Sequence, residues 1–155
     1  MNNVLFKQLN DVDGRYLKDA ELSTVQDFVG SYTQRINVYR YLQEHKDALI
    51  LKTLRSLMTS HRQVIQQHGE ICKRDLGHFL RYVALSILKD DEQEFIEALV
   101  LWMQNILFSM KRDESCVGVY IALQSIISEE MLPDEAALVN HYVSIFIDAL
   151  KVGKG

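Results

Sequence analysis

Three residues within one helical turn combine the groups needed to bind a charged organic ligand covalently. Cys72 offers a thiol nucleophile, Arg74 a cation that pairs with carboxylates, and Asp75 an anion that accepts hydrogen bonds from protonated nitrogens. Residues three apart share a helix face, so Cys72 and Asp75 are expected to face the same ligand. Taken singly, Cys72 also suits a buried small apolar position, and Arg74 with Asp75 a solvated surface pair.

The helix that carries these residues is predicted from Cys72 to Leu88. Apolar residues recur there at helical spacing, and the predicted inward face is Leu76, Phe79, Leu80, Val83 and Ile87. The stretch before it, Thr59 to Glu70, is polar, with two histidines, three glutamines and Gly69. We therefore expect a loop immediately before the cysteine.

Helical periodicity continues on both sides of this segment. Upstream we expect a helix from Glu21 to His45, bent or split at Gly30 and Ser31, and a second one through Leu49 to Leu57. Asp91 and Glu94 form a capping-box pattern for a helix that runs to Met110. That helix has two apolar stripes: Phe95, Leu99, Trp102, Ile106 and Met110, and Ile96, Val100, Met103 and Leu107. It should be buried on more than one side.

Two further helices complete the prediction. After a turn at Lys111 to Ser115, the segment Val117 to Glu130 carries one apolar face, made by Val119, Leu123, Ile126 and Ile127. Pro133, followed by Asp134 and Glu135, opens the last helix. Its expected face is Leu138, Tyr142, Ile145, Phe146 and Ala149.

Composition indicates one all-α domain. The 155 residues include one proline and seven glycines, too few for the many turns of a β-sandwich or barrel. Apolar residues make up 48% and charged residues 25%, which is typical of a folded globular chain. We expect a single domain over residues 1–155, of bundle or globin type, with residues 151–155 as a flexible tail.

Charge and patterning argue against several functional classes. The net charge of −4 and the scattered cations disfavour nucleic acid and anionic membrane as partners. The longest apolar run, Ala98 to Met103, is too short to insert into a membrane, and Met1 to Asn10 lacks the pattern of a signal peptide. We therefore expect a cytoplasmic protein.

Enzymatic and metal chemistry are also disfavoured by the sequence. It shows no glycine-rich phosphate loop, nucleophile elbow or carboxylate dyad, so we expect no enzyme. Two cysteines are too few for a zinc site or a disulfide framework, and the five histidines form no zinc-binding helical pair; a haem site is disfavoured for the same lack of pattern. Cys116 falls in the predicted turn and is expected to be simply exposed.

The run Cys72-Lys73-Arg74-Asp75, followed by Phe79-Leu80-Arg81, resembles the bilin-attachment helix of the phycobiliproteins. The segment Asp11 to Leu17, with Gly14-Arg15-Tyr16, is similar to the entry segment of that family. The resemblance implies a globin-like helical core with an N-terminal helical pair that grips a partner subunit. Residues 1–16 would then form an interface segment, with Asp11, Arg15, Tyr16 and Arg81 at the contact between subunits.

The same resemblance assigns a pigment and its ligands. Cys72 would form a thioether to a linear tetrapyrrole of the phycocyanobilin type, Asp75 would bind the pyrrole nitrogens, and Arg74, assisted by Lys73, would pair with a propionate. Partners would be phycobiliprotein-like subunits in homo- or hetero-oligomers, together with phycobilisome or photosystem proteins. The protein would be cytoplasmic, and one option is that it binds peripherally to the cytoplasmic side of the thylakoid membrane.

Three functions stay open at this point. The first is a bilin-binding subunit in light harvesting or otherwise associated with the phycobilisome. The second is a non-pigmented adaptor of the same fold, for assembly, turnover or regulation; it is suggested by the stretch Met58 to Cys72, which is shorter than in family members. The third is a non-haem globin-like sensor module with an apolar ligand.

Overall fold

The structure, a computed structural model, describes residues 3–109 and 113–152, with side chains for all of them except 106–114. Every regular element in these ranges is helical, which confirms the all-α prediction. The elements are α1 (Asn3–Asn10), α2 (Asp19–Gly30), α3 (Tyr32–Leu57), α4 (Arg62–Lys89), α5 (Glu92–Phe95), the π-helical turn η1 (Ile96–Val100), α6 (Leu101–Ser109), α7 (Asp113–Glu130) and α8 (Pro133–Val152).

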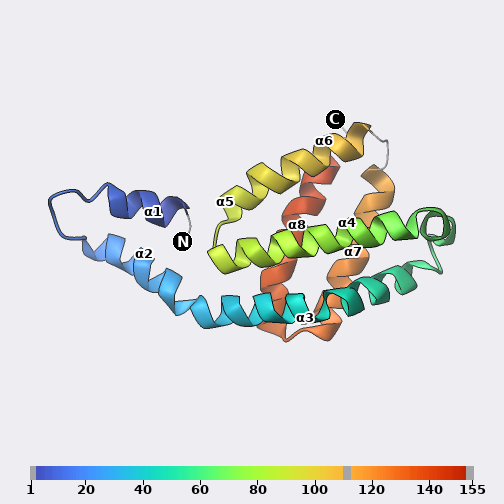
Figure 1. The fold of residues 1–155 in the computed structure, drawn as a ribbon, viewed down its shortest axis with the longest axis horizontal. Helices are drawn as coiled ribbons and strands as arrows, with labels where there is room; N and C mark the ends of the chain where they lie inside the picture. Colours follow the sequence, from blue (N-terminus) through green and yellow to red (C-terminus); the bar gives the residue numbers. More distant parts are fainter. Residues whose placement is uncertain (1–2, 110–112, 153–155) are drawn as a thin grey trace.

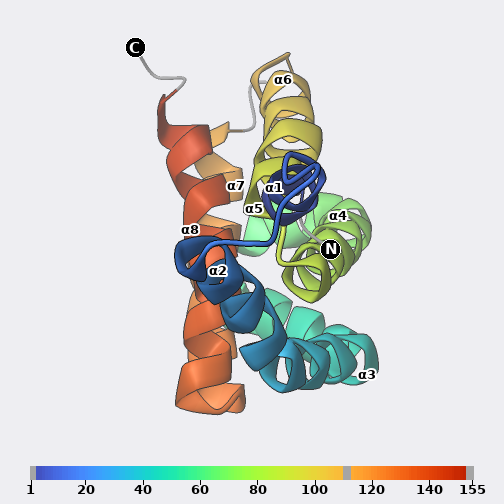
Figure 2. The same cartoon turned by 90° about the vertical axis from the view of Figure 1, so that its left-hand side faces the viewer.

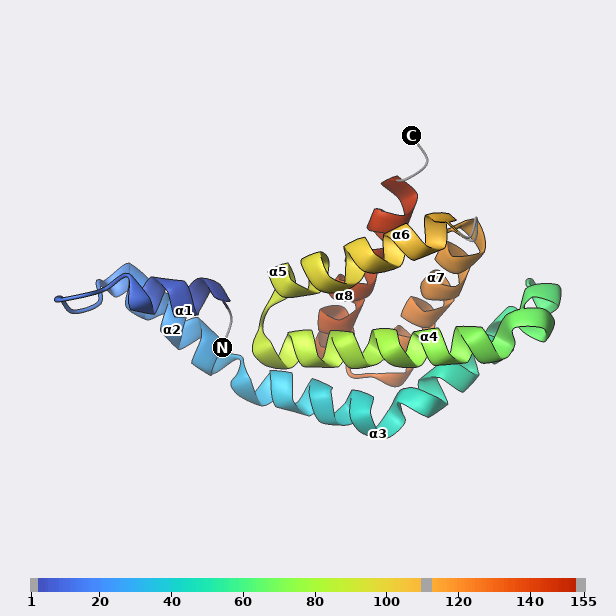
Figure 3. The same ribbon diagram turned by 45° about the horizontal axis from the view of Figure 1, so that its top comes forward.

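The helices form two crossing layers with an arm at one end. Antiparallel α3 and α4 lie side by side, with the α5–η1–α6 rod beyond α4, and the α7–α8 pair crosses behind them at a steep angle (Figure 1). The view from the side separates the α7–α8 layer from the α3–α4 layer (Figure 2). The hairpin of α1 and α2, called here the N-terminal arm, projects past the end of the core (Figure 3).

An aromatic cluster joins the two layers. Phe79, on the inner face of α4, packs its ring 4.8 Å from that of Tyr120 and 4.9 Å from that of Phe146, measured between centroids. The Tyr120 and Phe146 rings meet edge to face at 4.6 Å, a favourable geometry for aromatic pairs. The five residues predicted for the inward face of α4 are all buried: Leu76, Phe79, Leu80, Val83 and Ile87. This packing fixes which face of α4 turns away from the core.

The predicted helix boundaries are partly wrong around α3 and α4. The break at Ser31 is confirmed, but α3 then continues without interruption to Leu57. The loop expected from Thr59 to Glu70 is also wrong, because α4 already begins at Arg62. In its first turns most polar side chains lie in solvent, while Val64 and Ile65 are half-buried. A narrow apolar stripe and good helix formers are therefore enough to form a helix here. Cys72 therefore lies well inside a helix.

The rod from α5 to α6 contains the least regular backbone of the core. Asp91 caps its start and accepts a hydrogen bond from the Glu94 amide at 3.0 Å, which confirms the predicted cap. The Leu101 amide then bonds to the Ile96 carbonyl, five residues back, which defines the π-turn. This turn holds one residue more than an α-turn, so the side chains that follow it are shifted around the helix axis. Phe95, Leu99, Val100 and Met103 are buried as predicted, but the inward prediction for Trp102 is wrong, because its side chain is 57% exposed.

Other predicted faces have mixed outcomes. All four inward residues of α7 are buried: Val119, Leu123, Ile126 and Ile127. On α8, Tyr142 and Phe146 are buried as predicted, but the rest of the buried face is Ala136, Val139, Val143, Ile147 and Leu150 rather than Leu138, Ile145 and Ala149, which are half-buried. Asp113 to Ser115 belong to α7 and not to a turn, and α8 reaches Val152. The predictions for Met110, 111–112 and 153–155 lie outside the described residues, and those for Ile106 and Leu107 concern side chains that are not described.

Arg35 anchors the N-terminal arm to the core. Its guanidinium is buried and donates to the carbonyl of Phe28 in α2 at 2.7 Å, to the carbonyl of Leu88 in α4, and to the Ser31 hydroxyl at 2.9 Å. The two carbonyls lie in the last turns of their helices, where a cation is favourable. At the other end of the arm, the Asn3 amide donates to the Asp91 carboxylate at 3.2 Å.

Candidate functional site

A pocket of about 800 Å³ lies between α4 and a wall made by η1, α6 and α7. From α4 it is lined by Cys72, Arg74 and Asp75, together with His68, His78 and Arg81. The opposite wall is mostly apolar and includes Leu99, Trp102, Met103, Cys116 and Val119. The volume lies within the range usual for sites that hold an organic molecule, and an apolar lining with a few converging polar groups is typical of them.

Cys72 and Asp75 share this pocket because the burial of Leu76 and Phe79 turns their common face toward it. Both are half-buried. The Asp75 carboxylate accepts from Arg74 at 3.3 Å from Nε and 3.2 Å from Nη2. The Arg74 side chain is 65% exposed, so this ion pair is weak and can be exchanged for another partner.

Cys116 lines the same pocket from α7, and this corrects the prediction that it lies in an exposed turn. It is half-buried within the first turns of that helix. No pattern in the sequence indicates this position, because the polar segment before Val117 has no helical periodicity. Only the crossing of α7 behind α4 brings the second thiol to the pocket that Cys72 lines (Figure 1).

A buried tyrosine, Tyr120, lies on α7 one turn after Cys116. Burial raises the pKa of Tyr120 well above its ordinary value, and the ionisable groups of Cys116, Asp75 and Cys72 raise it further. The Tyr120 ring, 4% exposed, stays neutral and serves as packing between Phe79 and Phe146.

Lys73 lies differently from its neighbours. It is not among the residues that line the pocket; it lines a smaller hollow of about 350 Å³ between α3 and α4, near Lys46 and Glu70. Arg81, like Arg74 and His78, lines both hollows, and its Nη2 is 2.8 Å from Nδ1 of His78. The cation available to a ligand in the larger pocket is thus supplied by Arg74 and Arg81.

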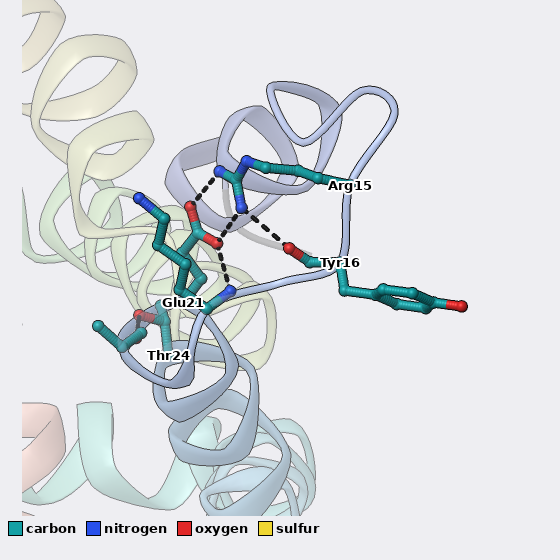
Figure 4. A network of polar contacts seen from close by, with 6 residues as sticks. Arg15, Tyr16, Glu21 and Thr24 are labelled. Carbon is teal, nitrogen blue, oxygen red and sulfur yellow. Dashed lines mark hydrogen bonds and ion pairs between the residues drawn. The ribbon is translucent and has the colours of Figure 1, made fainter.

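The other predicted interface residues lie in the arm, far along the chain from the pocket. Asp11 is exposed, and Arg15 binds Glu21 through hydrogen bonds of 3.0 and 2.8 Å and the Tyr16 carbonyl at 3.0 Å (Figure 4). This contact lowers the pKa of Glu21 to about 2, chiefly through the Arg15 hydrogen bonds and then through the Lys18 amide. The Tyr16 side chain is 97% exposed and points away from the chain (Figure 4).

The arm buries part of its apolar surface within the single chain. Leu5 is 1% exposed, whereas Val4 and Phe6 are 69% and 54% exposed. Leu5 is therefore buried without any partner subunit. Further along the arm, Leu22 and Val29 are also exposed, as is Tyr32 at the start of α3, so an apolar surface remains available on this side of the molecule.

Comparison with known proteins identifies the family. The family model described as phycobilisome protein matches residues 7–150. The chain belongs to the phycobilisome protein family. It is 25% identical over 150 residues to allophycocyanin subunit alpha 1 of Nostoc, covering 91% of this chain and 93% of that one, and 23% identical, with the same coverage, to the allophycocyanin alpha chain of Cyanidium caldarium. The allophycocyanin alpha-B chain of Cyanidium caldarium is 31% identical over 90 residues, 53% of this chain and 55% of that one.

Membership in the phycobilisome family confirms the resemblance drawn from the Cys72 to Arg81 run and the globin-like all-α fold. Within the described ranges no cluster of three or more histidine, cysteine or acidic residues is arranged to hold a metal ion. No described helix is long and apolar enough to cross a membrane. The pocket residues that sequence reasoning missed are His68, His78 and Cys116. Helical spacing was a usable signal for the two histidines, since His68 lies four residues before Cys72 and His78 three residues after Asp75.

Proposed function

We propose that this chain is a light-harvesting or phycobilisome-associated subunit that carries a linear tetrapyrrole on Cys72. One observation supports this most: a single pocket of about 800 Å³ brings together a thiol, a carboxylate and two guanidinium groups beside an apolar wall. Each of these features matches one part of such a pigment, which has an electrophilic side chain, protonatable nitrogens, two propionates and a flat apolar face.

Each pocket residue would bind a different part of the pigment, according to its chemistry. The Cys72 thiol would attach the pigment by adding to its ethylidene double bond, forming a sulfur–carbon bond and leaving the thiol proton on the neighbouring ring carbon. Asp75, one turn along α4, would accept hydrogen bonds from the nitrogens of the middle rings and keep them protonated. Arg74 would exchange Asp75 for a propionate, since a guanidinium and a carboxylate form a bidentate pair.

We propose further that the N-terminal arm joins this chain to other phycobiliprotein-like subunits. In the arm, the exposed Val4, Phe6 and Val29 would supply apolar area, and Asp11, Arg15 and Tyr16 polar contacts. Outside the arm, Tyr32 on α3 and Arg81 on α4 would add to these surfaces. The Arg15–Glu21 pair already holds the loop before α2 in one shape, which lowers the entropy cost of binding. Such an assembly would lie in the cytoplasm, peripheral to the thylakoid membrane.

The test of pigment binding is expression of the chain together with phycocyanobilin synthesis and a bilin lyase. We expect a coloured protein whose band on a denaturing gel fluoresces with zinc, and we expect Cys72→Ala to lose that fluorescence. Gln66→Ala, an exposed position on the same helix outside the pocket, is the matched control and should keep it. Circular dichroism checks that both variants fold.

A colourless wild-type protein under these conditions would contradict the pigment proposal. It would favour the adaptor function, which the exposed apolar side chains of the arm support independently of the pocket. The adaptor would bind phycobilisome or photosystem subunits through the arm, and deletion of the arm, but not Cys72→Ala, would then abolish binding.

A further inference from the structure

The two cysteines of the chain lie on different walls of the same pocket. Cys72 belongs to α4 and Cys116 to α7, two helices from different layers of the fold (Figure 2). Both are half-buried and both open to the 800 Å³ pocket. A ligand anchored on Cys72 therefore meets a second thiol on the other side.

Cys116 and Asp75 line the pocket from opposite walls, Cys116 on α7 and Asp75 on α4. Asp75 is the residue proposed to bind the nitrogens of the middle rings, and the central methine carbon joins those two rings. The Cys116 thiol therefore faces the pigment from the wall opposite Asp75.

We propose that Cys116 is a second, reversible thiol ligand that adds to the central methine carbon of the pigment held on Cys72. This inference rests on the proposed pigment-binding function. In the step, the Cys116 thiol releases its proton to solvent and the thiolate forms one sulfur–carbon bond to the methine carbon. One carbon–carbon π bond is lost, and its electron pair neutralises the positive charge on the conjugated ring nitrogens. Nothing is oxidised or reduced, so the step reverses when the thiol is protonated again.

The addition divides the conjugated system into two halves, so red absorption is replaced by violet absorption. Because one proton is released, the ratio of pigment bonded to Cys116 to pigment held by Cys72 alone should rise about tenfold per pH unit while the pigment stays protonated. Other titratable groups also face the pocket. From α4 these are His68, Asp75, His78 and Tyr82, beside the cations Arg74 and Arg81. The described side chains that η1 and α6 contribute to the pocket do not titrate: Ala98, Leu99, Trp102 and Met103. Their titration affects wild type and variant alike, so the comparison isolates Cys116.

The experiment compares pigment-loaded wild type with Cys116→Ser across neutral to mildly alkaline pH. We expect the red band of wild type to bleach reversibly as pH rises, with a violet band replacing it, and we expect Cys116→Ser to stay red while its gel band keeps zinc fluorescence. Ser125→Ala, exposed on the same helix, is the matched control and should bleach like wild type. A second readout is thiol alkylation followed by mass spectrometry: N-ethylmaleimide should label Cys116 in pigment-free protein and label it more slowly in the bleached form. If Cys116→Ser does not fold, alkylation of folded wild type supplies the same comparison.

Each outcome decides a separate question. Three outcomes would overturn the second-ligand proposal while leaving pigment binding intact. They are equal bleaching in wild type and Cys116→Ser, no bleaching in wild type, and equal labelling of Cys116 in the pigment-free and the bleached protein. Zinc fluorescence that survives Cys72→Ala but not Cys116→Ser would overturn it too, because Cys116 would then be the anchor. A wild-type gel band without zinc fluorescence would instead overturn the proposed function, and this inference with it.

Discussion

Replacement of Arg35 by alanine is expected to lower the free energy of unfolding by about 2–4 kcal/mol. The guanidinium is 3% exposed and donates to two main-chain carbonyls, of Phe28 and Leu88, as well as to the Ser31 hydroxyl. A hydrogen bond to a charged group contributes about 1.5–3 kcal/mol, so two of them total about 3–6 kcal/mol. The desolvation of the buried cation offsets part of that sum, which leaves the lower range.

The assay is urea unfolding followed by helical circular dichroism, at one protein concentration because association would add to stability. Arg40→Ala is the matched control: Arg40 is exposed on the same helix, and its loss should change stability by no more than about 0.5 kcal/mol. Arg35→Lys keeps the charge but lacks the planar fork that reaches two carbonyls at once, so it should fall between wild type and Arg35→Ala.

An Arg35→Ala protein as stable as Arg40→Ala would refute this reasoning. It would mean that water satisfies the two carbonyls as well as Arg35 does, and that the arm is held to the core by other contacts. The reasoning would also fail if Arg35→Lys were as stable as wild type, because charge alone would then explain the effect.

Three further predictions follow from the pocket and the arm. In pigment-loaded protein, Asp75→Asn should make the pigment nitrogens lose their proton at lower pH than in wild type, since their anionic partner is gone; an unchanged absorption titration would show that Asp75 does not touch them. Removal of residues 1–10 should weaken association more than Arg81→Ala in sedimentation, because apolar burial contributes about 25 cal/mol per Å² whereas an exposed ion pair contributes about 0–1 kcal/mol; equal effects would contradict this. Contact with Arg15 lowers the pKa of Glu21 to about 2, so the ionised Glu21 carboxylate should stabilise the ordered arm loop at neutral pH. This stabilisation should be lost as the pH falls from the ordinary pKa of a glutamate through about 2. In Arg15→Ala, NMR titration should show the Glu21 pKa raised toward its ordinary value, and an unchanged Glu21 pKa would exclude the pair.

The sequence predicted best where a local pattern coincides with burial. The inward face of α4 could be read from apolar spacing alone, because its five predicted members pack into one continuous core. The Asp91 cap was equally readable, since capping depends on residues only three apart. Cys72, Arg74 and Asp75 were placed on one helix for the same reason, and the pocket that Cys72 and Asp75 share is consistent with the common face predicted for these two residues.

What the sequence did not predict depends on contacts between distant segments. Whether Thr59 to Glu70 forms a loop or a helix is decided by packing of the α4 start, not by its polar composition. The position of Cys116 depends on how α7 crosses α4, and no spacing within the chain encodes that crossing. Lys73, adjacent to Cys72 in sequence, lines a different hollow because it lies on the side of α4 that faces α3.

The π-turn at Ile96–Val100 bears on how this protein is compared with its relatives. Its i→i+5 hydrogen bond encloses one residue more than an α-turn, while α5 and α6 continue as ordinary helix on both sides. A chain that lacked one residue here would form an unbroken α-helix and still present the same side chains before and after it. A length difference between homologues can thus fall inside this helix without a loop to absorb it. An alignment that forbids gaps within helices would pair Trp102 with residues that occupy the place of Met103, and would misassign one wall of the pocket.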